Sequence, residues 1–340
     1  MSFVLLPASF AVLLLGAYFF TNAVEWAGHR LRLGQGAVGS LLAAVGTALP
    51  ESIIPVIALI TGGKADAVAI GAIVGAPFML ATIAMALVGV SAFAFRSKRS
   101  TGQRLDVHRP TVGRDLWFFL VLFTIALLLG LGASTALRSV VAVAFVLAYV
   151  VYVRLTLAGG GAVQPSASLR PLYLDPSRSD PPSNTTIVLQ LLVALGAIVG
   201  GSHLFVEELL HVADRMGVSA LVLALVLAPL ATELPEKANS FLWTREGKDT
   251  LALGNITGAM VFQSTIPTVV ALVLAPTAWV AAEGSYTAFA SAGIAFLSSA
   301  AIFIPMARRG RLRGRDLLVG GAFYVVYLGL VVAVISGTAG

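Results

Sequence analysis

The chain has 340 residues, of which 58% are hydrophobic and only 11% charged, and its net charge is +6 at pH 7. A water-soluble domain of this length carries far more charge, so the composition excludes an ordinary soluble enzyme or binding module. Cysteine is absent, which excludes disulfide frameworks, thiolate metal sites and cysteine nucleophiles. The apolar residues form runs of about 20, the length that crosses a bilayer core of about 30 Å as a helix. We therefore expect an all-α, polytopic membrane protein.

Ten transmembrane helices are predicted. In chain order they cover 3–22, 36–61, 66–92, 115–133, 136–157, 185–208, 218–243, 250–275, 286–306 and 316–336. The first run has no basic leader and no small-residue cleavage signature, so we interpret it as a retained helix and not a signal peptide. The stretch 158–184 is rich in Pro, Ser and Gly and predicts a flexible linker. It separates two five-helix halves, 1–157 and 185–340.

The distribution of basic residues predicts the orientation in the membrane. Eighteen of the 22 Lys and Arg residues lie in loops that follow odd-numbered spans. Because such basic loops remain in the cytoplasm, we expect the linker 158–184 to be cytoplasmic and both termini to face outward, in a bacterial-type plasma membrane. The basic excess is then a matter of topology, and the lipid bilayer, not nucleic acid, is the expected partner.

Two motifs occur once in each half, within the regions 46–80 and 231–263. The matched segments are GTALPE at 46–51 with ATELPE at 231–236, and DAVAIGAIVGA at 66–76 with DTLALGNITGA at 249–259. Both motifs fall on the second and third spans of their half. Since each half has an odd number of spans, the second copy enters the membrane in the opposite direction. This pattern predicts two inverted five-helix repeats.

The first motif places Glu51 and Glu236 inside apolar spans. An ionised carboxylate at the centre of a membrane helix costs about 2.5–3.5 kcal/mol, so a cation, a proton, a basic partner or a water-filled cavity must offset it. Pro50 and Pro235 each remove a backbone donor and free a carbonyl, which is tolerated where it lines a cavity. We therefore expect broken second and seventh helices, with both glutamates at a midplane cation site. Oxygen-only ligation of this kind suits calcium or sodium.

The second motif carries glycines and a leading aspartate. Gly71–Gly75 and Gly254–Gly258 have the four-residue spacing of small residues that favours close helix packing. Asp66 and Asp249 begin the third and eighth spans, where a negative charge suits a helix N-terminus. We interpret both aspartates first as helix caps and second as groups on an ion access route.

These motifs resemble the two α-repeats of the cation/calcium antiporter superfamily, which contains the sodium/calcium exchangers. The resemblance covers both halves of the chain. It implies exchange of Ca²⁺ for Na⁺ or H⁺ by alternating access, with the first and sixth spans as the sliding gate. It also implies that Glu51 and Glu236 are the central metal ligands and that Thr47 and Thr232 contribute further oxygens.

The chain departs from the family pattern on the spans that carry the glycine motif. Asn255 and Gln263 share one face of the eighth span as candidate cation-binding residues. The matching face of the third span, formed by Ala72, Ala76 and Leu80, has no side-chain ligand. The flanking sodium sites of a typical exchanger are therefore in doubt, and fewer sodium ions, or protons, become the expected counter-ions.

Glu233 is a further departure, because the matching position in the first half is Ala48. One interpretation makes Glu233 a third cation-binding carboxylate, in which case mutual repulsion would lead one of the three to hold a proton. The other makes it the charge partner of Lys237, four residues later, at the favourable Glu-before-Lys spacing. The sequence leaves both interpretations open.

The leading hypothesis is thus a secondary active cation antiporter with no resident cofactor, whose transported ions are Ca²⁺ and Na⁺ or H⁺. The alternatives are an exchanger for another divalent metal, a non-exchanging cation channel, and a scaffold without transport. An intramembrane enzyme that uses Glu51 and Glu236 as acid and base is disfavoured, because no nucleophile or metal triad accompanies them.

Overall fold

The computed structural model describes residues 2–30, 49–158, 170–175, 182–281, 286–309 and 311–338. These residues are helical apart from turns, short connecting segments and one two-stranded ribbon. Eight helices are long and apolar enough to cross a membrane, and two shorter apolar helices accompany them, Glu51–Thr61 and Ala220–Pro229. The prediction of an all-helical, membrane-type protein is confirmed at this level.

The described elements overlap the predicted spans, but residues 36–48 of the second predicted span lie outside the described residues. Before the linker they are α1 (Ser2–Arg30), α4 (Leu49–Thr61), α5 (Ala65–Met79), a π-helical turn (Leu80–Ala84), α6 (Met85–Ala94), strand β1 (Arg104–Leu105), α7 (Arg109–Gly130) and α8 (Thr135–Ala158). After it they are α9 (Asn184–Met216), α10 (Ala220–Thr232), α11 (Leu234–Arg245), α12 (Asp249–Leu274), α13 (Tyr286–Arg309), strand β2 (Leu312–Arg313), α14 (Gly314–Leu317) and α15 (Val319–Thr338). Strands β1 and β2 pair antiparallel.

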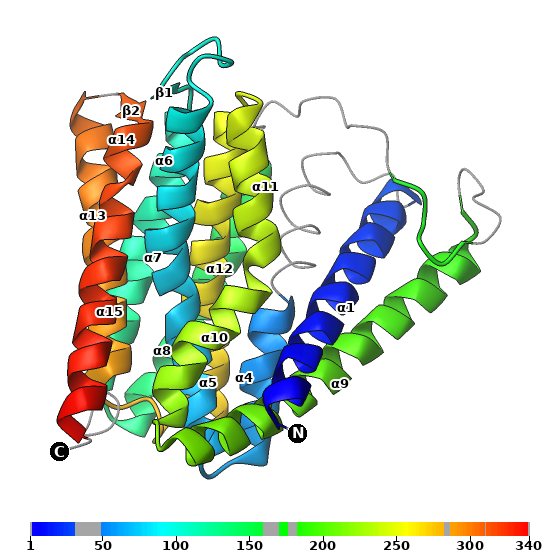
Figure 1. Ribbon diagram of the computed structural model, residues 1–340, viewed down its shortest axis with the longest axis vertical. Helices are drawn as coiled ribbons and strands as arrows, with labels where there is room; N and C mark the ends of the chain where they lie inside the picture. The colour runs from blue at the N-terminus through cyan, green and yellow to red at the C-terminus, as the bar shows by residue number, and fades with distance from the viewer. Residues whose placement is uncertain are drawn as a thin grey trace.

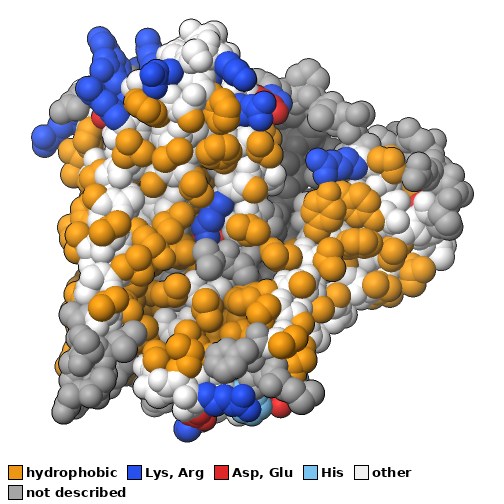
Figure 2. Space-filling model, viewed as in Figure 1, with side chains coloured by type: hydrophobic (Ala, Val, Ile, Leu, Met, Phe, Trp, Pro, Cys, Tyr) orange, Lys and Arg blue, Asp and Glu red, His pale blue; other side chains and the backbone are white. Residues whose placement is uncertain are grey.

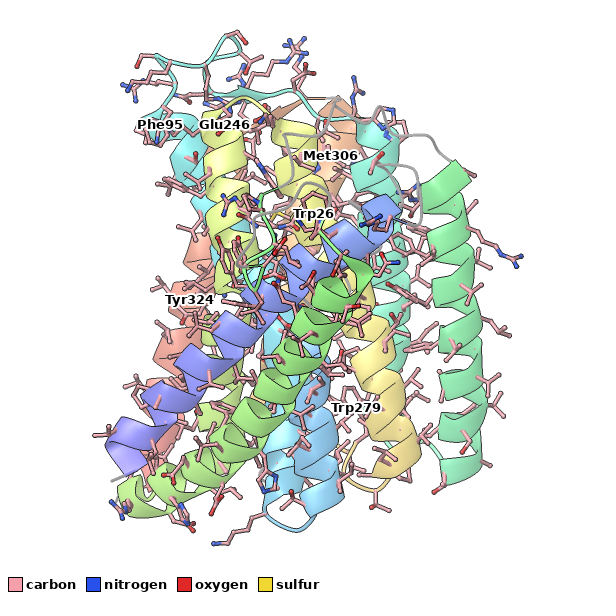
Figure 3. All side chains as sticks on the ribbon, turned by 90° about the vertical axis from the view of Figure 1, so that its right-hand side faces the viewer. Trp26, Phe95, Glu246, Trp279, Met306 and Tyr324 are labelled. Atoms are coloured by element: carbon pink, nitrogen blue, oxygen red, sulfur yellow. The ribbon has the colours of Figure 1, made fainter. Side chains whose placement is uncertain are left out.

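Most helices stand upright in one bundle, while α1 and α9 slant away from it together (Figure 1). The view turned by 90° places α1 and α9 side by side in front of the other helices (Figure 3). Helix α1 begins and α15 ends at the lower end of the bundle, whereas β1, β2 and α14 lie at the upper end. The fold therefore contains a compact bundle and a separate helix pair.

The surface has the distribution expected of a membrane protein. Hydrophobic side chains cover the middle of the visible face, while Lys and Arg side chains gather at the upper end, with a smaller group at the lower end (Figure 2). Helix α8 has exposed Val140, Val143, Leu147 and Val151 along its length. In contrast, 78% of the most apolar 18-residue stretch within the span Ala65–Ala94 is buried inside the protein. This span, made by α5, the π-helical turn and α6, is the packed centre of the bundle.

The first glycine pair allows a close helix contact. A Cβ added to Gly71 would lie 2.4 Å from the carbonyl oxygen of Leu221, and one added to Gly75 would lie 2.4 Å from that of Leu225. Only glycine allows α5 to approach α10 so closely, so the predicted close packing is confirmed for this pair. Among the described residues, a Cβ added to Gly254 would meet nothing within 4 Å, and one added to Gly258 would be 3.4 Å from the Tyr152 hydroxyl. Since the first part of the predicted second span, 36–48, lies outside the described residues, close packing of the second pair stays a prediction.

Part of the linker is bound to α1 and α9. The indole nitrogen of Trp26 donates to the carbonyl of Arg170 at 2.9 Å, and the backbone N–H of Leu174 donates to Oε1 of Gln190 at 2.8 Å. Tyr173 stacks on Tyr18 with ring centroids 5.0 Å apart. Residues 170–175, which we expected to be part of a flexible linker, therefore hold the α1–α9 pair together.

Candidate functional site

Four charged side chains are buried at the start of α4 and around the break between α10 and α11, and we call them the acidic cluster. Its members are Glu51, Glu233, Glu236 and Lys237, each at most 5% exposed. Glu51 lies within electrostatic range of both Glu236 and Glu233. Residues predicted as a pair from motifs far apart in the sequence are thus brought to one place inside the bundle.

A break in the helix path shapes the side of the cluster after the linker. Helix α10 ends at Thr232, and Glu233 leaves helical geometry with φ −90° and ψ 6°. Helix α11 then begins at Leu234, with Pro235 in its first positions. Proline is tolerated there because its missing N–H would have had no partner in the helix. Glu236 consequently lies in the first turn of α11, where the helix dipole favours a negative charge.

Lys237 and Glu233 form an ion pair. Nζ of Lys237 lies 3.1 Å from Oε2 of Glu233 and donates to the carbonyl of Pro229 at 3.0 Å. The backbone N–H of Lys237 bonds to the carbonyl of Glu233 at 3.1 Å, so the helical turn that joins the two residues persists across Pro235. The structure thus contains the ion pair that one interpretation of Glu233 expected, while its role as a cation ligand stays a prediction.

Glu51 has no ion-pair partner among the described residues. Neither of its carboxylate oxygens makes a hydrogen bond with another residue that the structure describes, although Thr232 lies near it. The Thr232 hydroxyl donates to the carbonyl of Ala228 at 3.0 Å, which leaves its lone pairs able to accept or to ligate. The predicted ligand Thr47 lies outside the described residues.

The two polar residues predicted on α12 have different surroundings. Gln263 is buried beside Glu233, and its Oε1 accepts no hydrogen bond within the described chain. The amide of Asn255 instead donates to the carbonyl of Glu236 at 3.3 Å and to the Ser240 hydroxyl at 3.1 Å. Gln263 therefore faces the acidic cluster, while Asn255 fastens α12 to α11.

The charge and ligand types of the cluster suit a hard cation. Three carboxylates and one ammonium lie together here, so acidic groups outnumber basic groups among the described members of the cluster. No three His, Asp or Glu side chains in the described residues have the geometry to hold a metal ion by themselves. A bound calcium ion, which takes six to eight oxygens, would therefore also need hydroxyl, carbonyl or water oxygens.

Asp115 is a buried carboxylate that the sequence analysis did not single out. It accepts hydrogen bonds from the Thr257 hydroxyl at 2.9 Å and the Tyr152 hydroxyl at 3.2 Å, and it pairs with Arg114 at 3.2 Å. These bonds connect α7 to α8 and α12. A single aspartate at the start of an apolar run does not predict bonds to two other helices, α8 and α12.

Asp249 does not cap α12 as predicted. Its carboxylate forms two 2.8 Å bonds with the guanidinium of Arg99, and the pair is fully buried. The N–H of Asp106 donates to the same carboxylate at 2.8 Å, and the N-cap position of α12 is Lys248. Asp249 thus locks the loop after α6 onto the start of α12.

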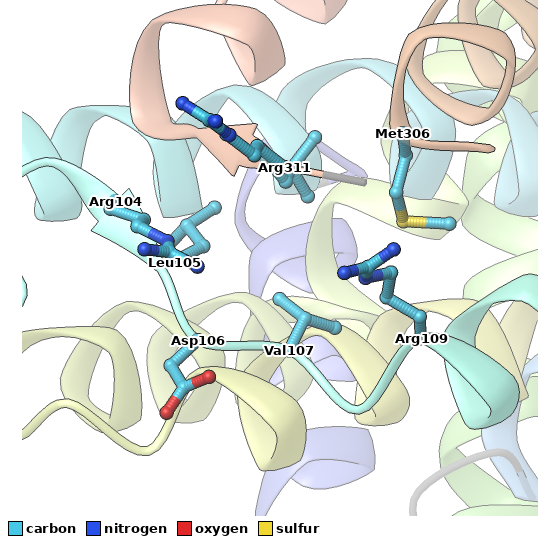
Figure 4. Close-up of a pocket in the computed structure, with 8 residues that line it drawn as sticks. Arg104, Leu105, Asp106, Val107, Arg109, Met306 and Arg311 are labelled. Carbon is cyan, nitrogen blue, oxygen red and sulfur yellow. The ribbon is translucent and has the colours of Figure 1, made fainter. Parts of the chain in front are cut away.

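Two surface hollows lie apart from the acidic cluster. The first, of about 90 Å³, is at the β1–β2 ribbon and is lined by the exposed Arg104, Arg109 and Arg311 with Asp106 (Figure 4). The second, of about 270 Å³, is lined by residues of α4 and α9 that include His203, Glu207 and His211. Neither shares a residue with the cluster, so the buried carboxylates remain the candidate site.

Sequence comparison connects the chain to known exchangers. The family model described as "Sodium/calcium exchanger protein" matches residues 1–158 and 186–336. CaxA of Alkalimonas amylolytica, named as a candidate antiporter, is 27% identical over 161 residues, which are 47% of this chain and 49% of CaxA. The sodium/calcium exchanger MaX1 of Methanosarcina acetivorans is 33% identical over 72 residues, 21% of each chain. The matched part is thus about half of CaxA and a fifth of MaX1.

Solved structures share the fold. The H⁺/Ca²⁺ exchanger CAX superposes with a TM-score of 0.75 at 18% identity, covering 99% of this chain and 85% of CAX. The sodium-calcium exchanger NCX_Mj superposes with a TM-score of 0.60 at 18% identity, covering 97% of this chain and 99% of NCX_Mj. At such identity the likeness concerns the fold alone. Because the family model matches both sides of the linker, the resemblance inferred from the motifs is confirmed, and the chain belongs to the sodium/calcium exchanger protein family.

Proposed function

We propose that the protein is a secondary active antiporter that exchanges Ca²⁺ for Na⁺ or H⁺ by alternating access, with Glu51 and Glu236 as the metal ligands. The observation that carries this proposal is the burial of their carboxylates, from α4 and α11, in one cluster inside the bundle. An ionised carboxylate in the apolar layer costs about 2.5–3.5 kcal/mol. Bound cations or protons would offset this cost.

The fold supports an inverted-repeat architecture for this antiporter. We assign the halves to 1–157 and 185–340, with 158–184 as the cytoplasmic linker and both termini outside. Glu51 and Glu236 are each the third residue of a helix, α4 and α11 respectively. The crowding of basic side chains at one end of the bundle, opposite the start of α1 and the end of α15, supports the orientation (Figures 1 and 2).

Further ligands come from both motifs in this proposal. The Thr232 hydroxyl and Oε1 of Gln263 are buried oxygens beside the carboxylates, and Thr47 is the counterpart of Thr232 in the first half. Carboxylate, hydroxyl and amide oxygens together select hard cations such as Ca²⁺ over soft transition metals. Asn255 acts by holding α12 against α11.

The moving part would be the α1–α9 pair. These helices pack against each other and slant away from the bundle (Figure 1), whereas Gly71 and Gly75 lock α5 against α10. A sliding pair over a rigid bundle would expose the acidic cluster alternately to the two sides. Since an unneutralised cluster is costly in lipid, the pair would move only when the cluster is occupied, which couples the two ion fluxes.

Uptake of radioactive calcium into proteoliposomes tests the proposal. Purified protein is reconstituted, and either a sodium gradient or a pH gradient is imposed, each with and without the other. CAX exchanges H⁺ and NCX_Mj exchanges sodium against calcium, so both counter-ions belong in the test. We expect calcium to accumulate against its own gradient with at least one of them, and competition by magnesium or manganese to reveal selectivity among divalent ions.

Glu51→Gln should abolish this accumulation, while Glu207→Gln, which changes an exposed glutamate on α9, should retain it. Calcium that crosses without any counter-ion gradient and never accumulates would identify a channel. Vesicles that take up no divalent ion under any gradient would indicate a scaffold. Either result contradicts the proposal.

A further inference from the structure

The hollow at the β1–β2 ribbon, which we call the ribbon hollow, lies apart from the acidic cluster and has a basic lining. Three arginines from three segments surround it, namely Arg104 in β1, Arg109 at the first position of α7, and Arg311 just before β2. All three are exposed, and no guanidinium among them forms a hydrogen bond or an ion pair within the described residues. Since like charges repel, an anion bound among these arginines would be stabilising.

The rest of the lining is one carboxylate and several apolar side chains. The carboxylate of Asp106 points to the opposite side from Arg109 and Arg311 (Figure 4). The apolar lining consists of Leu105, Val107, Met306 and Leu312. The ribbon hollow therefore offers guanidinium groups together with apolar surface, which suits a ligand that has both an anionic group and an apolar part.

The ribbon directs two of the arginines. Leu105 and Leu312 are paired across β1 and β2, and both are buried. Because neighbouring side chains on a strand point to opposite faces, this burial turns Arg104 and Arg311 to the exposed side. The register of the ribbon thus brings together one arginine from each half of the chain.

The segment that leads to Arg109 is attached to the start of α12. The N–H of Asp106 donates to the carboxylate of Asp249 at 2.8 Å. The N–H of His108 donates to the Thr250 hydroxyl at 2.9 Å. A site whose backbone is already fixed loses less conformational entropy when its ligand binds.

The ribbon hollow lies where membrane-type helices begin and end. Helix α7 starts at Arg109 and α13 ends at Arg309, and both contain spans long and apolar enough to cross a membrane. Farther along these helices, Trp117 and Ile304 are exposed, and tryptophan is typical of the lipid–water boundary. Lys and Arg side chains also gather at this end of the bundle (Figure 2). In a bilayer the ribbon hollow would therefore lie at the level of the phospholipid headgroups.

We propose that the ribbon hollow binds the phosphate of an anionic phospholipid, with Arg104, Arg109 and Arg311 as its donors. Guanidinium groups bind phosphate oxygens through paired N–H bonds, and basic pockets between membrane helices bind anionic headgroups in this way. Phosphatidylcholine fits less well, because its quaternary ammonium would meet an arginine. The apolar lining would contact the glycerol and the start of an acyl chain. This inference goes beyond ion exchange and does not depend on which ions cross.

A bound headgroup would join the two halves of the chain. Arg104 and Arg109 follow α6, whereas Arg311 lies between α13 and α15. The ribbon connects these segments through two paired positions only. A ligand that binds the folded protein alone raises its stability, so an anionic phospholipid should raise the unfolding temperature.

The experiment titrates the purified full-length chain, in a non-ionic detergent, with short-chain phospholipids and follows the unfolding temperature. Dihexanoyl phosphatidylglycerol is compared with dihexanoyl phosphatidylcholine and with inorganic phosphate. We expect phosphatidylglycerol to reach half of its effect at a concentration about tenfold lower than phosphatidylcholine, roughly the contribution of one charge-assisted hydrogen bond. Inorganic phosphate, which lacks the apolar part, should give no shift in the same concentration range.

Replacement of the three arginines by glutamine tests the site. In Arg104→Gln/Arg109→Gln/Arg311→Gln the preference for phosphatidylglycerol over phosphatidylcholine should disappear. Arg109→Gln alone should reduce the preference about threefold, and it serves where the triple variant does not fold. The unfolding temperature without lipid shows which variants are folded.

A matched control removes three positive charges outside the ribbon hollow. Lys98→Gln/Arg154→Gln/Arg308→Gln changes exposed residues near the C-terminal ends of α6, α8 and α13. This variant should keep the tenfold preference of the native protein. A loss as large as in the variant of the ribbon hollow would mean that diffuse surface charge attracts the lipid, which overturns the inference.

Two results with the native protein would also overturn it. One is an equal half-maximal concentration for phosphatidylglycerol and phosphatidylcholine. The other is an equal response to inorganic phosphate and to phosphatidylglycerol, which would indicate a site for a free anion. Failure of the antiport function is a separate outcome, because the titration uses no ion gradient and measures no transport.

Discussion

The two halves of the chain contribute unequally to the acidic cluster. The first half supplies Glu51 from α4, and no other buried charge of the cluster in the described residues comes from it. The second half supplies Glu236, Glu233 and Lys237, and it also places Thr232 and Gln263 beside them. Each motif copy therefore supplies one glutamate, while the other described charged side chains of the cluster come from the second half.

The close glycine contact joins the two halves. Gly71 and Gly75 of α5, in the first half, allow close approach of α10, in the second half. Among the described residues, no atom lies within 4 Å of a Cβ added to Gly254. The comparison indicates that residues next to the shared motif determine the local charge of each half separately.

The largest expected effect concerns the motif glutamates, Glu51 and Glu236, which the two halves share. Glu51→Gln and Glu236→Gln should each abolish calcium binding, since a unit charge at about 4 Å contributes about 4 kcal/mol at an effective dielectric constant of 20, and a divalent ion doubles that value. Calorimetric titration of purified protein with calcium measures the loss. Retention of binding in one variant but not the other would show that the glutamates are not equivalent ligands.

The next prediction compares the two aspartates that begin the glycine motif. Asp249→Asn leaves the buried guanidinium of Arg99 without its carboxylate and should destabilise the protein by about 3–5 kcal/mol. Asp66→Asn changes a partly exposed residue with no ion pair in the described chain, and should alter stability by less than about 0.5 kcal/mol. Thermal unfolding in detergent measures both.

The double variant Arg99→Met/Asp249→Leu is the control for this pair. Replacement of both partners by apolar side chains should recover most of the lost stability, because no unpaired buried charge remains. The N-cap of α5 is Lys64, so neither aspartate occupies the cap position that we first expected. Equal destabilisation by Asp66→Asn and Asp249→Asn would mean that the buried ion pair of Asp249 contributes no more than a negative charge in the first turn of a helix.

Several features of the site were accessible from sequence for physical reasons. The proximity of Glu51 and Glu236 was expected because each lies in one of two copies of the same motif, and the break before Glu236 follows from the missing N–H of Pro235. A contact between Glu233 and Lys237 could not be predicted because it depends on a helical turn that continues across that proline. The bond from the N–H of Lys237 to the carbonyl of Glu233 shows that this turn continues.

Contacts between distant loops were not accessible. Arg99 and Asp249 are 150 residues apart, and no periodicity relates a loop to the start of a helix in the other half. The packing of residues 170–175 on α1 and α9 was missed for a similar reason, since a composition rich in Pro, Ser and Gly says nothing about Asn22 or Gln190 as partners.

A third prediction concerns the glycines. Gly75→Ala places a methyl group against the carbonyl of Leu225 and should destabilise the protein by about 1–3 kcal/mol through overpacking. Gly254→Ala meets no atom of the described residues and should stabilise α12 by about 0.5–1 kcal/mol, because alanine loses less backbone entropy in a helix. Unfolding temperatures measure both, with calcium transport as a second readout. Similar losses in both variants would mean that Gly254, like Gly75, lies against a neighbouring helix.

The smallest expected effect concerns Gln263, whose matched residue in the first half is Leu80. Gln263→Leu gives both halves the same residue and removes an amide oxygen that has no hydrogen bond in the described chain. We expect calcium affinity to fall about five- to tenfold, the equivalent of about one hydrogen bond, with little change in unfolding temperature. Asn255→Ala is the matched control, because its amide bonds to the α11 backbone and to Ser240. It should lower the unfolding temperature and change affinity less. The opposite pattern would place Asn255 at the ion and Gln263 in the scaffold, so the polar face of α12 would have to be reassigned.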